Sequence, residues 1–349
     1  MLRVVHIGLG RWGSVWCRDV LPHLESAGLA KTVAAVDTDV SSHGRAPAGV
    51  PCYTDLRDAL RDHAADFVTV VVQPAFHEAV IDVALEHDVH ILCEKPIADT
   101  MEACARVYRK VTAAGRKMAV TMSHRFDQDK HSLEAAVRGG DYGRLNYVVY
   151  RFTHNSRHVG DWGEFRYRIP DPLLVEGTVH HFDIVRALTR ADAVTVYART
   201  WNPPWSEFAG DSTALITVEM TNGTKVLYEG AKANASTMNG WGNDYIRAEC
   251  ENGTLELSRR RLRVLHGGAH DVPTADELPL LDTRSVWRNA WIAEQFCAWL
   301  RGGPEPPTTL ADNLQCAALL FAAIESAHTG EPVKVQDYLA AHLEATSSS

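Results

Sequence analysis

The chain of 349 residues is long enough for two domains that each bury their own core, and 46% of its residues are hydrophobic. Its net charge of −9 at pH 7 argues against nucleic acid as a partner. No apolar run approaches the ~18 residues that span a bilayer, so we expect no membrane partner. The seven isolated cysteines form no C-x-x-C pair and favour reduced thiols in a cytoplasmic protein.

The first third of the chain predicts strands and helices in alternation. Apolar segments of strand length recur at 3–8, 31–37, 66–72, 89–94 and 117–122. Between them, segments such as DLRDALRDHAA at 55–65 place apolar residues on one helical face. Because repeated strand–helix units form parallel sheets, we expect an α/β domain with a doubly wound sheet over 1–123.

A glycine motif directly follows the first predicted strand. In VVHIGLGRWGSVW, Gly8, Gly10 and Gly13 have the G-x-G-x-x-G spacing that lets the backbone approach a pyrophosphate at a helix N-terminus. Asp37 ends the second predicted strand, where a carboxylate can bind a ribose diol and repel a 2′-phosphate. We therefore expect NAD(H) as the preferred cofactor. NADP(H) is the less favoured alternative, because Arg45 follows in the same loop.

The stretch HILCEKP at 90–96 ends the fourth predicted strand with charged residues. The carboxyl ends of parallel strands face the ligand crevice, so Lys95 is placed to bind a substrate oxygen and to stabilise negative charge developing there. Glu94 can hold a ribose or orient the lysine. Pro96 fixes the backbone, and a cis Lys95–Pro96 bond is compatible with this turn. A surface lysine without function is the alternative interpretation.

The pattern changes after residue 124. Two hairpins are indicated, with Asn222-Gly223 and Asn252-Gly253 at their turns, because Asn-Gly tolerates the positive φ angles of tight turns. Helices are expected near 173–189, 285–301 and 308–328. We therefore predict an α+β domain over 124–340 and a flexible tail over 341–349. The basic run SRRRLR at 258–263 is interpreted as the solvated face of a strand.

One predicted helix carries several ionisable residues. Glu176, His180 and Asp183 are spaced i, i+4 and i+7, so they share a helix face. A neutral imidazole there can take a proton from an alcohol while carboxylates fix its tautomer. A solvated helix face is the alternative, and a zinc site that also uses His181 is another. Adjacent histidines point in different directions, so we expect no metal.

Three motifs in this order resemble those of the glucose–fructose oxidoreductase/inositol dehydrogenase (GFO/IDH/MocA) family. They are GLGRWG after the first strand, EKP after the fourth, and E-G-x-x-H-H-x-D on the later helix. QPAFH at 73–77 and SHRFD at 123–127 are weaker matches. The resemblance implies an N-terminal Rossmann domain followed by a C-terminal α+β domain. That second domain has a large, mostly antiparallel open sheet, through which a homodimer or homotetramer forms.

The resemblance also implies roles for individual residues. Lys95 and His180 would be the catalytic pair, with Glu176 orienting the histidine and Asp183 supporting it. The family more often has aspartate at the position of Glu176. The expected cofactor-binding residues are Gly8, Gly10, Arg11, Trp12, Gly13, Asp37, Gln73, Pro74, His77, Glu94, Lys95, Pro96, His124 and Arg125. The expected substrate-binding residues are Lys95, Arg125, Trp162, Arg166, Tyr167, Glu176 and His180.

These features predict an oxidoreductase that transfers hydride between nicotinamide and the carbinol carbon of a cyclic polyol or sugar. The segment 151–170 is rich in His, Arg, Trp and Tyr, which suits sugar recognition. Two alternatives use the same fold. One is an enzyme that oxidises a glycoside, eliminates the aglycone and reduces the product again with retained NAD. The other is a non-catalytic NAD-sensing regulator.

Overall fold

The computed structural model describes residues 1–160 and 163–345, and Trp162 of the predicted substrate site lies outside them. The chain forms two units. Unit 1 contains residues 1–123 and 286–317 and the described residues from 342 onward, and unit 2 contains 124–285 and 318–341. None of the helices in the described ranges is long and apolar enough to cross a membrane.

Unit 1 is built on a six-stranded sheet in the order β3-β2-β1-β4-β5-β6. All neighbouring strands run parallel, with β1 between β2 and β4. The strands are β1 (Leu2–Ile7), β2 (Ala30–Val36), β3 (Cys52–Tyr53), β4 (Phe67–Val70), β5 (His90–Cys93) and β6 (Met118–Val120). The predicted doubly wound sheet is confirmed. Its strand order reverses at β1, and such a reversal is where ligands bind in these folds.

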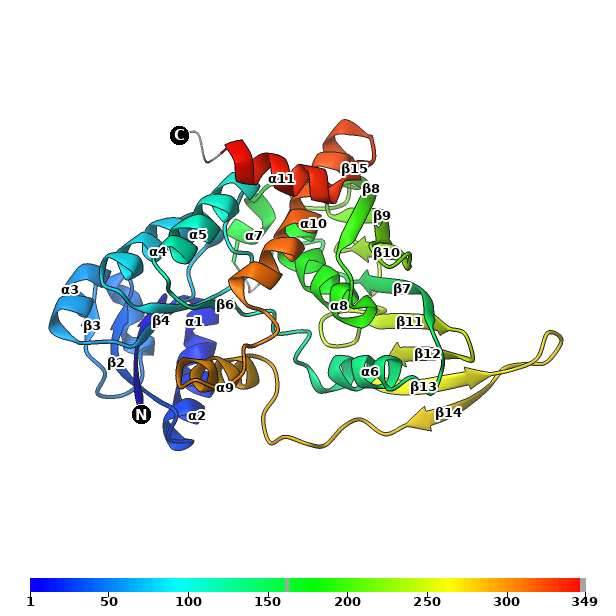
Figure 1. The fold of residues 1–349 in the computed structure, drawn as a ribbon. Coiled ribbons are helices and arrows are strands. Elements are labelled where there is room, and N and C mark those ends of the chain that lie inside the picture. The colour runs from blue at the N-terminus through cyan, green and yellow to red at the C-terminus, as the bar shows by residue number, and fades with distance from the viewer. Residues whose placement is uncertain (161–162, 346–349) are drawn as a thin grey trace. The chain divides into compact units, whose positions relative to one another are not determined.

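Helices of unit 1 form two groups on the faces of this sheet (Figure 1). The first group is α1 (Arg11–Val15), the π-helical turn η1 (Trp16–Val20), α2 (Leu21–Ser26) and α9 (Asn289–Leu300). The second group is α3 (Leu56–Asp62), α4 (His77–Glu86) and α5 (Met101–Ala113). Short 3-10 turns lie at η2 (Val40–Arg45) and η3 (Pro74–Phe76). Asp55 and Thr100 cap α3 and α5 by accepting backbone N–H bonds.

The sequence places residues 286–317 in the second domain, but in the structure they belong to unit 1. The reason is the apolar face of α9, where Phe296 is fully buried and packs edge-on against Phe67 of β4. An edge-to-face aromatic pair of this kind adds roughly 0.5–1.5 kcal/mol beyond the area that it buries. Periodicity predicts the helix, but it does not predict which sheet the helix covers.

Unit 2 contains a nine-stranded sheet in the order β14-β13-β12-β11-β7-β10-β9-β8-β15. Only β7 and β10 pair in parallel. The strands are β7 (Leu145–Thr153), β8 (Ala193–Trp201), β9 (Thr213–Met220), β10 (Lys225–Ala231), β11 (Tyr245–Cys250), β12 (Gly253–Ser258), β13 (Arg261–His266), β14 (Thr274–Leu278) and β15 (Val333–Lys334). The expected open, mostly antiparallel sheet is therefore present, and β9–β10 and β11–β12 are the two predicted hairpins.

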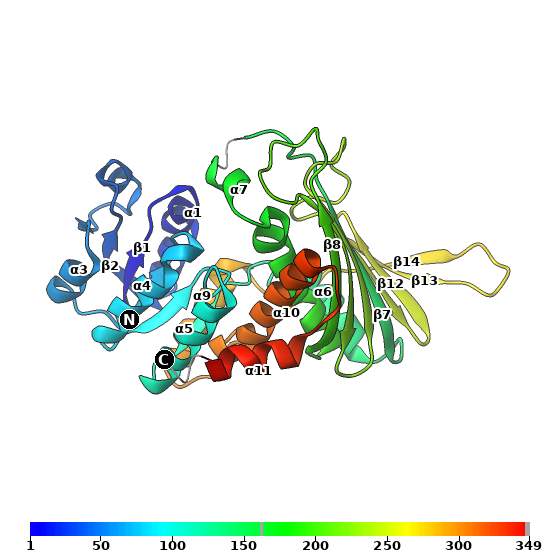
Figure 2. The same ribbon diagram turned by 90° about the horizontal axis from the view of Figure 1, so that it is seen from above.

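One face of this sheet is covered by helices (Figure 2). The helices of unit 2 are α6 (Gln128–Gly139), α7 (Phe165–Arg168), the π-helical turn η4 (Leu174–Thr178), α8 (Val179–Thr189) and the C-terminal part of α10 (Leu310–Thr329). Strand β9 shows the alternation that follows, because Ala214, Ile216 and Val218 are buried while Leu215 is 50% exposed.

The C-terminal end differs from the prediction. Helix α11 (Val335–Ala345) continues through residues 341–345, which the sequence assigns to a flexible tail. The helix is held by its apolar face, where Val335 and Leu339 are buried. Residues 346–349 lie outside the described part of the chain.

Candidate functional site

The glycine loop of unit 1 connects β1 to α1, and two of its positions exclude any side chain. Gly8 has a φ of +99°, and a Cβ there would lie 2.2 Å from the Val71 carbonyl oxygen. A Cβ on Gly13 would lie 1.8 Å from the Gly8 carbonyl oxygen. A Cβ on Gly10 would meet open space, and Arg11 begins α1 with an exposed side chain. Glycines at these positions let the loop backbone approach a dinucleotide pyrophosphate closely, so we call this loop the glycine cradle.

Asp37 is held against this loop by backbone hydrogen bonds. The Leu9 N–H donates to its Oδ2 at 2.6 Å, and the Asp39 N–H donates to its Oδ1 at 2.9 Å. The Arg45 guanidinium donates to the Leu9 carbonyl oxygen at 3.0 Å. Asp37 and Arg45, the acid and the arginine considered for cofactor choice, therefore both bind the backbone of Leu9. The carboxylate accepts from the Leu9 N–H, and the guanidinium donates to the Leu9 carbonyl oxygen.

Glu94 joins the end of β5 to the helices that follow the glycine loop. Its Oε1 accepts hydrogen bonds from the indoles of Trp12 at 2.7 Å and Trp16 at 3.0 Å, and from the Asn289 amide at 3.4 Å. The side chain is buried. Trp16 and Asn289 were not among the predicted site residues. Trp16 ends the quoted glycine stretch but lies outside its G-x-G-x-x-G spacing, and Asn289 lies 195 positions from Glu94.

The QPAFH and EKP segments meet in unit 1. The Nδ1 of His77, a fully buried residue, lies 3.0 Å from the Pro96 carbonyl oxygen and 3.2 Å from that of Ile97. Burial lowers the pKa of His77 although these carbonyl groups oppose the shift. The Lys95–Pro96 peptide bond is cis, and the Lys95 side chain is half-buried. His77 thus supports the backbone just after the lysine, whereas Gln73 is exposed and Pro74 half-buried.

In unit 2, the predicted continuous helix is two elements, with Glu176 in the π-helical turn η4 and His180 and Asp183 in α8. The acids are paired with arginines. Glu176 forms an ion pair with Arg166, and Asp183 Oδ1 accepts a contact of 3.5 Å from the Arg125 guanidinium. Both arginines belong to the predicted substrate site, so the structure brings four predicted residues together in two ion pairs.

His180 lies in an aromatic group. Its ring stacks on that of His124 with centroids 4.2 Å apart and an angle of 13° between the planes. The Trp241 ring stands edge-on to His124 at 5.2 Å and to His180 at 6.3 Å. Both histidines are buried, whereas Trp241 is 41% exposed. Sequence reasoning missed Trp241, although a tryptophan within the glycine- and asparagine-rich stretch NGWGND is a weak signal.

Tyr167 contacts other parts of the protein through both its hydroxyl and its ring. Its hydroxyl lies within hydrogen-bond distance of two backbone carbonyl oxygens, that of Ser156 at 3.0 Å and that of His158 at 2.6 Å. Its ring stacks on Phe208 with centroids 4.2 Å apart, and the residue is buried. Tyr167 therefore anchors the segment that the sequence assigns to sugar recognition, and its role as a substrate contact remains a prediction.

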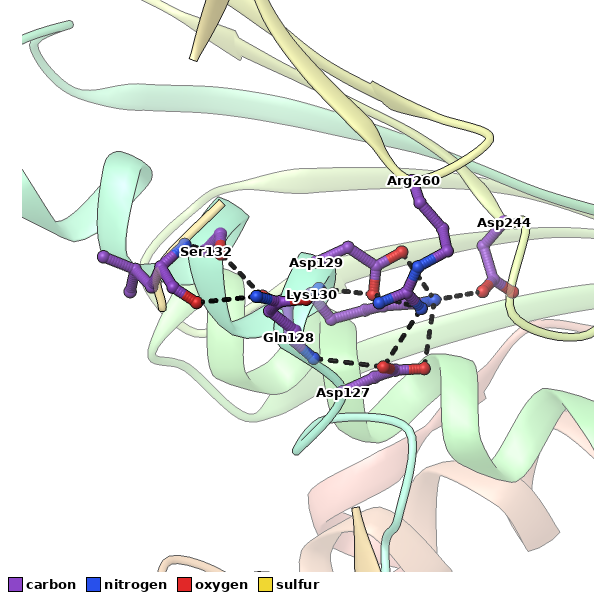
Figure 3. Close-up of polar contacts among 8 residues, drawn as sticks. Asp127, Gln128, Asp129, Lys130, Ser132, Asp244 and Arg260 are labelled. Atoms are coloured by element: carbon purple, nitrogen blue, oxygen red, sulfur yellow. Dashed lines mark hydrogen bonds and ion pairs between the residues drawn. The ribbon is translucent and has the colours of Figure 1, made fainter. Parts of the chain in front are cut away.

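A charge cluster surrounds the buried Lys130 (Figure 3). One of its members, Asp244, lies 3.6 Å from His181. Lys130 is 2% exposed. Its ammonium group contacts the carboxylates of Asp244 at 2.8 Å, Asp129 at 3.1 Å and Asp127 at 3.9 Å. Burial alone would lower the pKa of Lys130, but these carboxylates raise it above the ordinary value. Arg260 of the basic run lies in the turn between β12 and β13, with a φ of +61°, and not on the strand face that the sequence predicts. Its side chain is 41% exposed and contacts Asp127 at 3.1 Å.

The neighbours of Asp244 favour its ionised form. Burial alone would raise its pKa, but Lys130 and then the imidazoles of His181 and His124 lower it to about 2. Sequence reasoning did not single out Asp244 or Lys130, because the contact between these two residues joins segments 114 positions apart.

Comparisons with known proteins agree with this architecture. Residues 2–122 match the family model described as "Oxidoreductase family, NAD-binding Rossmann fold", and residues 131–256 match the GFO/IDH/MocA C-terminal domain. An uncharacterised protein, y4oX, of Sinorhizobium fredii is 43% identical over 97% of this chain and 96% of its own length. Inositol 2-dehydrogenase 1 of Paenarthrobacter aurescens is 26% identical over 96% of each chain.

Solved structures show the same fold. An oxidoreductase from Agrobacterium radiobacter, solved with NAD+, L-tartaric acid and magnesium, superposes with a TM-score of 0.82 at 22% identity. The match covers 96% of this chain and 99% of that one. The glycine cradle, the EKP turn and the η4–α8 segment with Glu176 and His180 thus occur in a chain whose two domains both have known counterparts. The chain belongs to the GFO/IDH/MocA family of NAD-binding oxidoreductases, dehydrogenases that act on CH–OH groups.

Proposed function

We propose that this oxidoreductase interconverts a secondary alcohol and a ketone on a cyclic polyol, sugar or sugar derivative. The observation that carries the proposal is the arrangement in unit 1, where Glu94 ties the glycine cradle to the strand end that presents Lys95. The similarity to an inositol 2-dehydrogenase supports a cyclic polyol as the substrate class. Bound NAD+ supplies the hydride acceptor at its nicotinamide ring.

In this proposal the protein moves the proton and stabilises charge. His180 takes the hydroxyl proton, directly or through Lys95, and the Lys95 ammonium stabilises the alkoxide-like oxygen. Glu176 orients His180, and Asp183 supports it. The ion pairs of these acids with Arg166 and Arg125 hold the two guanidinium groups in position for contacts with substrate hydroxyls. In the reducing direction the same groups return the proton.

We also propose NAD(H) over NADP(H). Asp37 presents a carboxylate fixed by two backbone donors, which would repel a 2′-phosphate. Arg45 donates a hydrogen bond to the Leu9 carbonyl oxygen, so its guanidinium is already used within the loop. The remaining predicted cofactor contacts, including His124 and Arg125, belong to the same proposal.

The outer face of the unit 2 sheet is proposed as the contact of a homodimer or homotetramer. Side chains on this face are partly exposed and apolar, and they include Tyr197 at 37%, Leu215 at 50% and Leu227 at 48%. In the described part of unit 2 no helix covers this face (Figure 2). We further propose a cytoplasmic location, which the seven free thiols support.

A substrate screen tests the proposed function. The protein is incubated with NAD+ and inositols, free sugars or sugar nucleotides, and NADH is followed by its absorbance. Accumulation of NADH with a cyclic polyol or sugar supports the proposal. Cleavage of a glycoside without net NADH would instead identify the oxidation–elimination enzyme. NAD binding without turnover of any compound would point to a regulator.

A further inference from the structure

Three buried residues of unit 2 come together outside the proposed catalytic pair. His124, His181 and Asp244 each offer one ligand atom, and these atoms all lie within 4.8 Å of one another. The three residues are 5%, 0% and 1% exposed. They come from the segment before α6, from α8 and from the loop before β11, so they are far apart in the sequence.

The Nδ1 of His181 has a hydrogen-bond partner in Tyr228. The Tyr228 hydroxyl lies 2.9 Å from this nitrogen and 2.9 Å from the Thr178 hydroxyl, which also lies 3.3 Å from the Leu173 carbonyl oxygen. When the His181 Nδ1–H donates to the Tyr228 oxygen, the neutral ring carries its lone pair on Nε2, and this nitrogen can bind a cation.

That lone pair faces a second acceptor. The Nε2 of His181 lies 3.6 Å from the Oδ1 of Asp244. This is longer than the ~2.7–2.9 Å of a hydrogen bond between an imidazolium and a carboxylate. Two ligands at about 2.0–2.1 Å from one tetrahedral zinc ion are roughly 3.3–3.4 Å apart. The observed separation is thus closer to that of two ligands sharing a cation than to that of a hydrogen-bonded pair.

The two oxygens of the Asp244 carboxylate have different neighbours. The Lys130 ammonium contacts the Oδ2 at 2.8 Å (Figure 3). The Oδ1 lies 3.6 Å from the Nε2 of His181. A cation bound at the Oδ1 would therefore have the ligand atoms of the two imidazoles within reach.

We propose that His124, His181 and Asp244 bind a divalent transition-metal cation of the zinc type. Two imidazoles and one carboxylate suit zinc better than magnesium or calcium, which prefer oxygen ligands. The Nδ1–H bond of His181 to Tyr228 is the kind of outer contact that orients a metal-bound histidine. The site differs from the one considered on the sequence, because Glu176 and Asp183 are paired with arginines.

The test is metal binding by untagged protein, independent of enzyme activity. The protein is stripped with a chelator and titrated with Zn²⁺ against a chromophoric competitor, and with Co²⁺ for the visible absorption of a low-symmetry site. We expect one ion per chain and a Tm that rises with Zn²⁺ concentration. His181→Gln and Asp244→Asn should each weaken binding by about 10²-fold or more.

His266→Gln is the matched control. His266 lies 3.6 Å from Asp276, the same separation as in the proposed site, but these side chains are 47% and 79% exposed. Its substitution should leave zinc binding unchanged. If Asp244→Asn does not fold, His124→Gln takes its place. Uptake that persists in the ligand variants would overturn the proposal. So would a lack of uptake by the unaltered protein, which would indicate that Nε2 carries a proton instead.

Discussion

In the proposed function, single side chains set two chemical choices, the cofactor that is preferred and the base that takes the proton. A residue could be predicted from the sequence where its role depends on residues close to it in the chain. Gly8 and Gly13 follow from spacing alone, because a local backbone requirement leaves a local pattern. Asn289 and Asp244 could not be predicted, because their importance arises only when distant segments meet.

Asp37→Ser tests the cofactor choice. Replacing the carboxylate removes repulsion of a 2′-phosphate, while serine keeps a hydrogen-bonding group near the loop. The ratio of kcat/KM for NAD to that for NADP should fall, by an energy on the order of 1–3 kcal/mol. Steady-state kinetics with both cofactors measure this ratio. Equal or better use of NADP by the unaltered protein would refute the assignment.

His180→Ala tests the proposed base. Turnover should fall by about 10²–10⁴-fold, the usual contribution of a general base. The acid limb of the pH–rate profile for alcohol oxidation should also disappear, since protonated imidazole cannot accept the proton. His266→Ala, in an exposed part of the same unit, should retain both turnover and limb. An acid limb that survives in His180→Ala would place the base elsewhere.

At the scale of helices and strands, periodicity was a reliable guide to type but not to detail. The Asn-Gly turns predicted two hairpins that the structure contains. The helix expected over 173–189 begins instead with the π-helical turn η4. The widened turn changes the angular spacing on which an i, i+4 argument depends, so Glu176 is not in a regular helical relation to His180.

The contact between α4 and α5 gives a stability prediction. Hydrogen bonds from Arg106 lower the pKa of Glu78 to about 2, and Lys110 adds to the effect. The folded state therefore holds this proton less tightly than the unfolded state does. The resulting stability is fully present above the unfolded pKa of ~4.3 and is lost as the pH falls through about 2.

Glu78→Gln should thus lower Tm at neutral pH, and the difference from the unaltered protein should shrink as the pH falls below ~4. Because the pair is partly exposed, the contribution is about 1 kcal/mol or less. Thermal unfolding across this pH range measures it. Glu305→Gln, in an exposed loop of the same unit, should have no effect. A Tm difference that is independent of pH would mean that packing, not charge, is lost.

For the whole chain, the sequence predicted two sheets of the correct kinds, because parallel and antiparallel sheets have different local patterns. It did not predict that residues 286–317 return to unit 1. The apolar face of α9 could cover either sheet, and in the structure it packs against α2, η1 and Phe67 of unit 1. Long-range assignment of helices is therefore the part that periodicity leaves open.

Leu227→Asp tests the proposed assembly. Leu227 lies on the outer sheet face and is 48% exposed, so a charge there would be buried unfavourably in a subunit contact. The mass measured by light scattering should fall to that of a monomer. Val272→Asp, at an 88% exposed position near the β13–β14 turn, should keep the mass of the unaltered protein. An unchanged assembly in Leu227→Asp would exclude this face as the contact.

The central claim is that Lys95 carries out chemistry rather than holding the fold, and Lys95→Met tests it most directly. Methionine keeps the apolar stem and removes the donor. With the substrate identified by the screen, kcat should fall by about 10²-fold or more while NAD affinity stays within a few-fold. Lys31→Met, an exposed lysine of the same unit, should change neither quantity. Near-normal kcat in Lys95→Met would contradict the account.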